Sequence, residues 1–184
     1  WLAIENVAGI DAAMLRLHLL TGGQRIEQLA RLRAQDVIDD AITLYDAKGR
    51  GQVARAHVVP LTARARAALA ELNTGREYLV SRSGTKPIDP TGLSRVAQKV
   101  AAIDGFKLKR VRSGVETLLA ARQVSKEIRG RLQSHGVAGV QAKHYDAYEY
   151  MAEKLGALEV LESALTTTDA KVIAIRPNKK TAKP

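Results

Sequence analysis

The chain has 184 residues, enough for one domain with a hydrophobic core, and its hydrophobic fraction of 46% is ordinary for a globular protein. It contains no cysteine, which excludes a disulfide framework and a thiolate metal site. The formal net charge of +10 is unusual and favours a polyanionic partner, most often nucleic acid. An inert basic surface or affinity for an anionic membrane surface would also account for it.

Further classes of protein are disfavoured by what the sequence lacks. It shows no signal peptide and no apolar stretch long enough to span a bilayer, so we expect a cytoplasmic, DNA-associated protein with no membrane partner. Aromatic residues make up only 4% of the chain, which argues against a stacking platform for single-stranded nucleic acid. Binding to a duplex through its phosphates needs no such platform.

The first part of the chain predicts two helices. Asp11 is expected to cap a helix over residues 12–20, which the glycines at 22–23 end. A second helix is expected over residues 24–32, because its apolar residues recur at helical spacing.

A small antiparallel sheet is expected next. Residues 41–45 and 53–61 read as two strands joined by the turn at 48–51, and residues 77–80 as a third strand. Residues 81–90, rich in Gly, Pro and Ser, are expected to form a loop.

The rest of the sequence indicates a mostly helical domain. Further helices are expected over residues 62–72 with Thr62 as cap, 91–102, 111–121, 125–132 with Ser125 as cap, and from 140 or 145 to 165. Residues 171–175 have strand character, and residues 176–184 form a basic end without expected order. The predicted fold class is α+β, mostly helical, with a small three-stranded antiparallel sheet.

A set of basic residues scattered along the chain ends in a tyrosine. A phosphodiester under attack gathers negative charge on its non-bridging oxygens, and guanidinium, ammonium and imidazole groups can stabilise that charge. A phenol oxygen can attack the phosphorus. In chain order, the set is Arg25, Lys48, Lys109, Arg112, His135 and Tyr145.

The sequence around these residues resembles the catalytic domain of the tyrosine recombinases, the phage-integrase family. Residues 21–32 resemble the family's first box, and residues 109–112 resemble its second, usually His-x-x-Arg. Residues 132–136 resemble the third box, and residues 139–145 the end of the last. The resemblance spans roughly residues 15–158, and it implies the family's catalytic-domain fold.

The resemblance also implies a mechanism. Tyr145 would attack a DNA phosphate to form a 3′-phosphotyrosyl intermediate, and Lys48 would protonate the leaving 5′ oxygen. The developing charge would be held by Arg25, Lys109, Arg112 and His135. The implied function is site-specific DNA recombination on double-stranded DNA, with self-association into a synaptic tetramer and without metal or other cofactor.

Two positions depart from the family's pattern. Lys109 stands where the family most often has His, and an ammonium donates hydrogen bonds but accepts no proton. Gln28 stands where many members carry an acid that supports the first catalytic arginine. These departures leave open a DNA-binding relative that has lost catalysis.

Other assignments also stay open. Local rivals for the site are Arg50 for Lys48, Arg110 for Arg112, His144 for His135, and Tyr148 or Tyr150 for Tyr145. Rival functions are a type IB topoisomerase-like enzyme, a structural basic protein, and a metal-dependent nuclease built on Asp36, Asp39 and Asp40.

The expected domain organisation is simple. Residues 1–165 would form the catalytic domain and residues 166–184 a C-terminal tail. The core-binding domain that precedes the catalytic domain in the family has no counterpart in these 184 residues, and we expect it to lie before Trp1.

Overall fold

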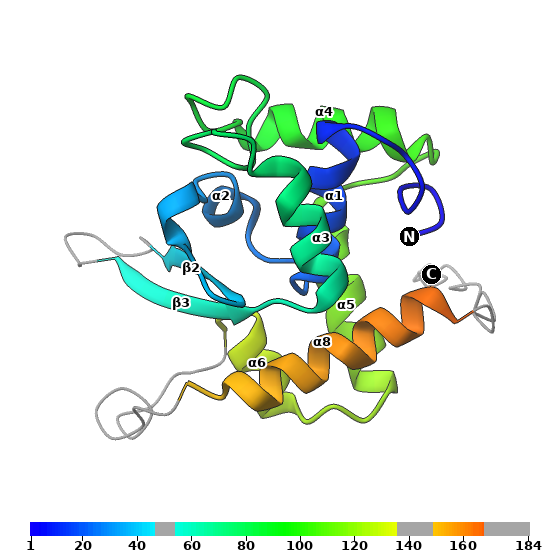
Figure 1. The fold of residues 1–184 in the computed structure, drawn as a ribbon. Coiled ribbons are helices and arrows are strands. Elements are labelled where there is room, and N and C mark those ends of the chain that lie inside the picture. Colours follow the sequence, from blue (N-terminus) through cyan, green and yellow to red (C-terminus); the bar gives the residue numbers. More distant parts are fainter. Residues whose placement is uncertain (47–53, 136–148, 168–184) are drawn as a thin grey trace, which may run out of the picture.

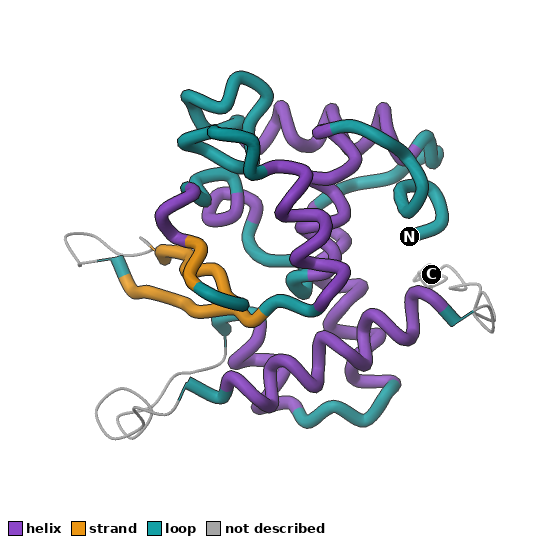
Figure 2. The backbone as a smooth tube through the Cα atoms, in the orientation of Figure 1, coloured by secondary structure: helices purple, strands orange, loops and turns teal. Residues whose placement is uncertain are grey.

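The computed structural model describes residues 1–46, 54–135 and 149–167. Within these ranges, the molecule is mostly helical and one small sheet lies at one side of it (Figures 1 and 2). The helices are α1 (Ile10–Leu20), α2 (Ile26–Leu29), α3 (Ala63–Leu72), α4 (Pro90–Ala101), α5 (Lys109–Ala121), α6 (Lys126–Leu132) and α8 (Met151–Thr166). The strands are β1 (Val37–Ile38), β2 (Ala41–Asp46) and β3 (Arg55–Pro60), preceded by the 3₁₀ turn η1 (Ala34–Asp36).

Helix α1 lies at the centre of the core. It packs against α3, α4, α5 and α8, and Met14, Leu17 and Leu20 on it are fully buried. A helix that is apolar on nearly all sides is stable only when other elements cover all of those sides, which is its position in Figure 1. None of the described helices is both long and apolar enough to cross a membrane.

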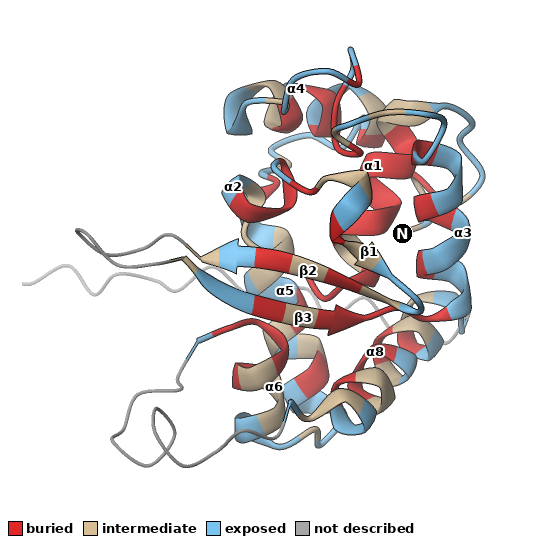
Figure 3. Cartoon of the chain, turned by 60° about the vertical axis from the view of Figure 1, so that its left-hand side comes forward, coloured by how far each residue is buried: buried red, intermediate tan, exposed pale blue. Residues whose placement is uncertain are grey.

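The sheet is three-stranded and antiparallel, in the order β1-β2-β3. Ile42 pairs with Val59 and Leu44 with His57, so these four side chains share the face that is buried against the helices (Figure 3). Because side chains alternate along a strand, the hairpin carries one buried face and one face that is only partly exposed. The predicted fold class and the predicted pairing of the two strands are confirmed, whereas the turn predicted at residues 48–51 lies outside the described residues.

The third strand is not the predicted one. Residues 77–80 were expected to pair in the sheet, but β1 takes that place. Tyr78 forms only an isolated bridge with Arg33, while Leu79 donates a backbone hydrogen bond to Leu32 and is fully buried with Val80. The apolar run therefore reflects burial in the core rather than a strand.

Three of the described helices, α3, α4 and α6, begin at a residue whose side chain caps them. Thr62 and Ser125 accept backbone hydrogen bonds at the starts of α3 and α6, as predicted. Asp89 caps α4 in the same way. The predicted cap by Asp11 is wrong, because α1 begins two residues earlier than predicted, at Ile10, and the Asp11 carboxylate pairs with the guanidinium of Arg82.

Two predicted helices are shorter than expected. The helix expected over residues 24–32 spans only Ile26–Leu29, because the Leu32 carbonyl accepts from Leu79 and the Gln24 side chain reaches back to the Thr21 carbonyl. The last helix begins at Met151, after Tyr150 in a left-handed conformation. The earlier part of that prediction, over residues 140–148, lies outside the described residues, as does the strand-like run at 171–175.

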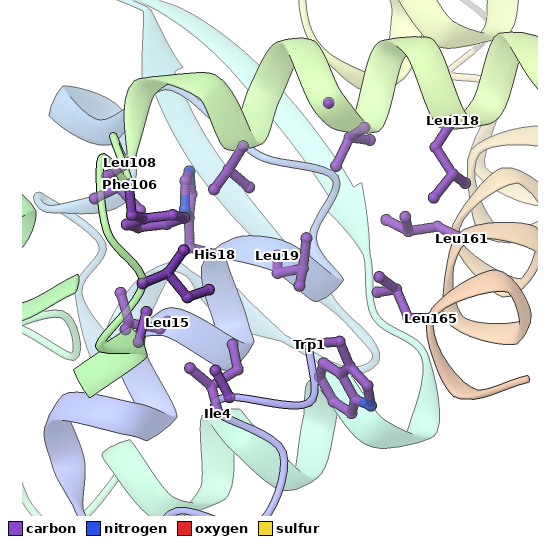
Figure 4. A pocket seen from close by; sticks show the side chains of 16 residues that line it. Trp1, Ile4, Leu15, His18, Leu19, Phe106, Leu108, Leu118, Leu161 and Leu165 are labelled. Atoms are coloured by element: carbon purple, nitrogen blue, oxygen red, sulfur yellow. The ribbon is translucent and has the colours of Figure 1, made fainter. Parts of the chain in front are cut away.

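An apolar cavity of about 320 Å³ lies between the N-terminal segment, α1, α5 and α8 (Figure 4). Trp1, Leu19, Phe106 and Leu165 are among the residues that line it. None of the predicted site residues that the structure describes lines the cavity, so Arg25, Lys109, Arg112 and His135 lie elsewhere.

Two consecutive glycines determine how the chain leaves α1. Gly22 has φ +86° and Gly23 φ +65°, a region that side chains with a Cβ rarely adopt. A Cβ on Gly23 would lie 2.8 Å from the Cα of Arg112, at the start of α5. The predicted helix end at residues 22–23 is confirmed, and the close approach brings the first and second boxes into contact.

Gly23→Ala is expected to destabilise the fold more than Gly105→Ala, which is a matched control. Gly105 has the same φ of +65°, but a Cβ added there would meet nothing within 4 Å. Gly105→Ala should cost about 1–2 kcal/mol from backbone strain alone. Gly23→Ala should cost a further 1–3 kcal/mol or so from overpacking against Arg112, measured by urea unfolding. Equal losses would mean that the contact with α5 relaxes without cost.

Candidate active site

Arg25 is the first predicted residue of the candidate site. It is the N-cap residue of α2, and its guanidinium lies between two other parts of the fold. Nη1 donates to Asp46 Oδ2 at 2.7 Å, and Nη2 donates to the Ser134 carbonyl at 3.2 Å. The arginine of the first box is therefore held by both the end of β2 and the residues that follow α6.

Arg112, in the first turn of α5, is the second. Its guanidinium donates to the Gly23 carbonyl at 3.3 Å and to the Gln133 carbonyl. Burial, and then the positive charge of Arg25, lower the pKa of Arg112 to about 10. The group remains charged near neutral pH, and the two guanidiniums are close enough to repel each other.

His135 completes the described cluster. Its Nε2 lies 3.0 Å from Oε1 of Gln133, and its backbone N–H donates to the Gly130 carbonyl at 2.9 Å. Partial burial, and then the Arg112 charge, lower the pKa of His135 below 6.5. The imidazole is therefore mostly neutral at pH 7 while no anion offsets the arginines.

The turn after α6 needs a glycine and a left-handed residue. Ser134 has φ 53°, and a Cβ on Gly130 would lie 2.6 Å from the His135 carbonyl oxygen. With hydrogen at that position, the chain folds tightly over the last turn of α6. This turn presents the carbonyls of residues 132–134 and the imidazole of His135 on one side.

A carboxylate supports Arg25 from an unpredicted position. Asp46 forms the ion pair with Arg25, and both side chains are partly shielded from solvent. Gln28, where the family resemblance places a supporting acid, is buried, and its amide atoms have no hydrogen-bond partner among the described residues. The acid partner of Arg25 in this chain therefore comes from the end of β2 rather than from α2.

Three further buried side chains hold the backbone of the site. His18 Nε2 lies 3.0 Å from the Gln24 carbonyl, and His57 Nε2 lies 3.0 Å from the Leu132 carbonyl. Gln24 also donates to the Leu132 carbonyl, at 2.9 Å. Sequence reasoning missed these residues, although the alternation of β3 could have placed His57 on the buried face with Val59.

Arg55 adds another cation at the edge of the cluster. It opens β3 opposite Asp46, and its Nη2 donates to the hydroxyl of Ser134 at 2.6 Å. Its side chain is exposed. It is therefore available to a large anion that approaches the site from solvent.

The other predicted residues either have no described contact with Arg25 or His135 or lie outside the described residues. Lys109 and its neighbour Arg110 are exposed at the start of α5, and neither contacts Arg25 or His135 by a described hydrogen bond or ion pair. Lys109 lies three residues before Arg112, so the two share a helix face. Lys48 and Tyr145, and the rivals Arg50, His144 and Tyr148, lie outside the described residues.

The carboxylates expected of a metal-dependent nuclease do not gather. No group of three or more His, Asp or Glu side chains able to hold a metal ion occurs in the described parts of the chain. Asp36 accepts from the backbone N–H of Arg33, and Asp40 pairs with Arg66. What does gather is positive charge on hydrogen-bond donors, which favours an oxyanion such as a phosphodiester.

Comparison with solved structures identifies the fold. The chain is similar to the catalytic core of lambda integrase, with a TM-score of 0.54 and 20% identity over 73% of this chain and 88% of that one. It is similar to the integrase of mycobacterium phage Brujita, with a TM-score of 0.66 and 14% identity over 86% of this chain and 54% of that one. XerA recombinase gives a TM-score of 0.53 and 16% identity over 86% of this chain and 63% of that one.

The chain therefore has the fold of tyrosine recombinase catalytic domains, as its sequence boxes predicted. It spans little more than half of the Brujita integrase. No family model matches the sequence, and no curated protein sequence matches it.

The two buried histidines predict a loss of stability in mild acid. Burial, followed for His57 by the Lys154 charge, lowers the pKa of both His18 and His57 from 6.5 to about 4. Because these values are depressed by folding, the unfolded chain binds more protons between pH 6.5 and 4. The free energy of unfolding is therefore highest above pH 6.5, where both histidines are neutral in either state, and it decreases as the pH falls toward 4.

At pH 5 each histidine should lower the free energy of unfolding by about 2 kcal/mol relative to pH 8, as measured by urea unfolding. His57→Gln keeps an N–H donor for the Leu132 carbonyl but does not titrate. Its unfolding free energy should fall by about 2 kcal/mol less than that of the parent over the same pH range. An unchanged pH dependence would show that His57 is not held neutral.

Proposed function

We propose that the chain is the catalytic part of a site-specific DNA recombinase of the integrase type, which cleaves and rejoins DNA by transesterification. The observation that carries this proposal is the meeting of Arg25, Arg112 and His135. They come from three segments far apart in sequence, and each of them contacts Gln133 or Ser134 in the turn after α6. The fold shared with tyrosine recombinase catalytic domains supports it further.

In the proposed reaction, the Tyr145 hydroxyl gives its proton to a solvent water and its oxygen attacks a DNA phosphorus. The new bond is a 3′-phosphotyrosyl ester, and the bond to the 5′ oxygen breaks. Lys48 gives a proton to that leaving oxygen. Arg25, Arg112, His135 and Lys109 stabilise the charge on the non-bridging oxygens. Because one ester replaces another, the linkage can be reversed onto a partner strand.

The position of Tyr150 supports Tyr145 as the nucleophile. The Tyr150 ring lies 4.1 Å from the guanidinium carbon of Arg131, and its hydroxyl accepts from the same arginine at 3.3 Å. It also precedes the first residue of α8 in a left-handed conformation. These contacts give Tyr150 a structural role at the start of that helix.

The proposed partners are double-stranded DNA and further copies of the chain. Solved neighbours include a lambda integrase dimer bound to a COC′ core site and a lambda integrase tetramer bound to a Holliday junction. This chain spans 44% and 45% of those proteins. We propose that residues 1–165 are the catalytic domain, that a core-binding domain completes the clamp on DNA, and that the 166–184 tail serves association. DNA binding by this chain alone should then weaken steeply with salt.

Covalent trapping tests the proposed function. The protein, with any core-binding domain that its gene encodes, would be mixed with nicked suicide duplexes tiled across the DNA that flanks the gene. An adduct that survives SDS is expected, and Tyr145→Phe should abolish it because the attacking oxygen is removed. Tyr148→Phe and Tyr150→Phe, which keep that oxygen, should still form the adduct.

Failure of every duplex to form an adduct, with salt-sensitive DNA binding intact, would instead indicate a DNA-binding relative without catalysis. Relaxation of supercoiled DNA without any site preference would indicate a type IB topoisomerase-like enzyme.

Arg25→Ala should reduce the rate of adduct formation by at least about 100-fold, the usual effect of removing one preorganised donor. The free energy of unfolding should change by about 1 kcal/mol, since the ion pair lost with Asp46 is partly exposed. Arg122→Ala, at the exposed far end of α5, is the matched control and should cleave like the parent. A parental rate in Arg25→Ala would remove this arginine from the site.

A further inference from the structure

Gln133 is a buried amide at the centre of the candidate site. It directly follows α6, and only 1% of its surface is exposed. Its Nε2 donates to the Gly22 carbonyl at 2.9 Å and to the Arg112 carbonyl at 3.0 Å. Its Oε1 lies 3.0 Å from Nε2 of His135. All three contacts are within hydrogen-bond distance, so both ends of the amide are used.

These contacts leave the amide only one chemically sensible orientation. Backbone carbonyl oxygens accept hydrogen bonds but cannot donate them, so the two that flank Gln133 require its NH₂ group. The oxygen of the amide must then be the atom that faces His135. The assignment follows from the partners and not from the near-identical shapes of the oxygen and nitrogen ends.

The orientation of the amide determines the tautomer of His135. An amide oxygen only accepts, so Nε2 of His135 must carry the hydrogen that joins them. The neutral ring therefore has its proton on Nε2 and its lone pair on Nδ1. The neutral ring then gains a proton at Nδ1, and the protonated ring loses it from the same atom.

We propose that Gln133 is a positioning residue that holds His135 in the Nε2–H tautomer and thereby makes Nδ1 the nitrogen that exchanges protons during DNA cleavage. The role in cleavage rests on the proposed function, whereas the tautomer does not. Gln133 touches no reacting atom in this scheme. It acts through His135 and through the carbonyl of Arg112.

Gln24 shows what a purely structural amide looks like in the same site. It is equally buried, at 1% exposed, and its Nε2 likewise donates to two backbone carbonyls, those of Thr21 and Leu132. Its Oε1, however, has no hydrogen-bond partner among the described residues. The two glutamines thus brace the backbone alike, but only Gln133 turns its oxygen toward a histidine.

The first experiment needs no mutation of Gln133. Two-dimensional ¹H–¹⁵N spectra of the 184-residue chain at pH 8 report the tautomer of each of its 4 histidines. The His135 signals are assigned by their loss in His135→Ala. We expect a protonated Nε2 and an unprotonated Nδ1. A protonated Nδ1 would overturn the proposal outright.

The second experiment compares Gln133→Leu with Gln24→Leu, each of which removes two donors to backbone carbonyls. Gln133→Leu should produce a detectable Nδ1–H population in His135, whereas Gln24→Leu should leave the parental tautomer. The proposal fails if Gln133→Leu keeps the parental tautomer, or if Gln24→Leu changes it equally. Circular dichroism confirms that each variant is folded, and if Gln133→Leu does not fold, Gln133→Met is used in its place.

The last arm measures cleavage of the suicide duplex against pH. Gln133→Leu should cleave about 10- to 100-fold more slowly than the parent, by analogy with the loss seen when a partner that orients a metal-bound histidine is removed. Its pH–rate profile should also shift, since the titrating nitrogen is no longer fixed. An unshifted profile would overturn the role in cleavage. Absence of cleavage by the parent would overturn the proposed function and leave the tautomer to be decided by the spectra.

Discussion

The candidate site depends on the hydrogen bonds that the guanidinium of Arg112 donates to two backbone carbonyls. The guanidinium donates to the Gly23 carbonyl on one side and to the Gln133 carbonyl on the other, and so joins the segments before α2 and after α6 to the start of α5. The approach is possible only because Gly23 has no Cβ to strike the backbone of Arg112. Since Arg25 and His135 belong to the joined segments, their places follow from this bond.

The same bonds explain why positive charge can accumulate at one point. The three carbonyls of residues 132–134 all accept from side chains, among them the guanidiniums of Arg112 and Arg25. Carbonyls at a helix C-terminus carry partial negative charge, so they stabilise these cations without a bound anion. Asp46 contributes one full negative charge to the same cluster. The donors are thereby fixed in advance, which is the condition for strong stabilisation of a developing anion.

The sequence predicted the elements that depend on local chemistry and missed those that depend on distant contacts. The Thr62 and Ser125 caps and the helix end at residues 22–23 follow from a few neighbouring residues, and the structure confirms them. Residues 77–80 read as a strand because burial and strand pairing leave the same apolar pattern. Arg25, Arg112 and His135 stood out as motif residues, whereas Asp46 and Gln133 acquire their roles only from partners far away in the chain.

The residues of the candidate site lie far apart in the sequence, and this affects when the site forms during folding. The bonds that assemble it join residues 108, 109 and 111 positions apart. Contacts of such long range form only after the intervening chain has folded, because closing so large a loop costs entropy until the rest of the core compensates. During synthesis, no nascent chain that ends before residue 132 can hold the cluster together. The cluster of Arg25, Arg112 and His135 therefore forms only once the chain has been made beyond these residues, and not in shorter fragments.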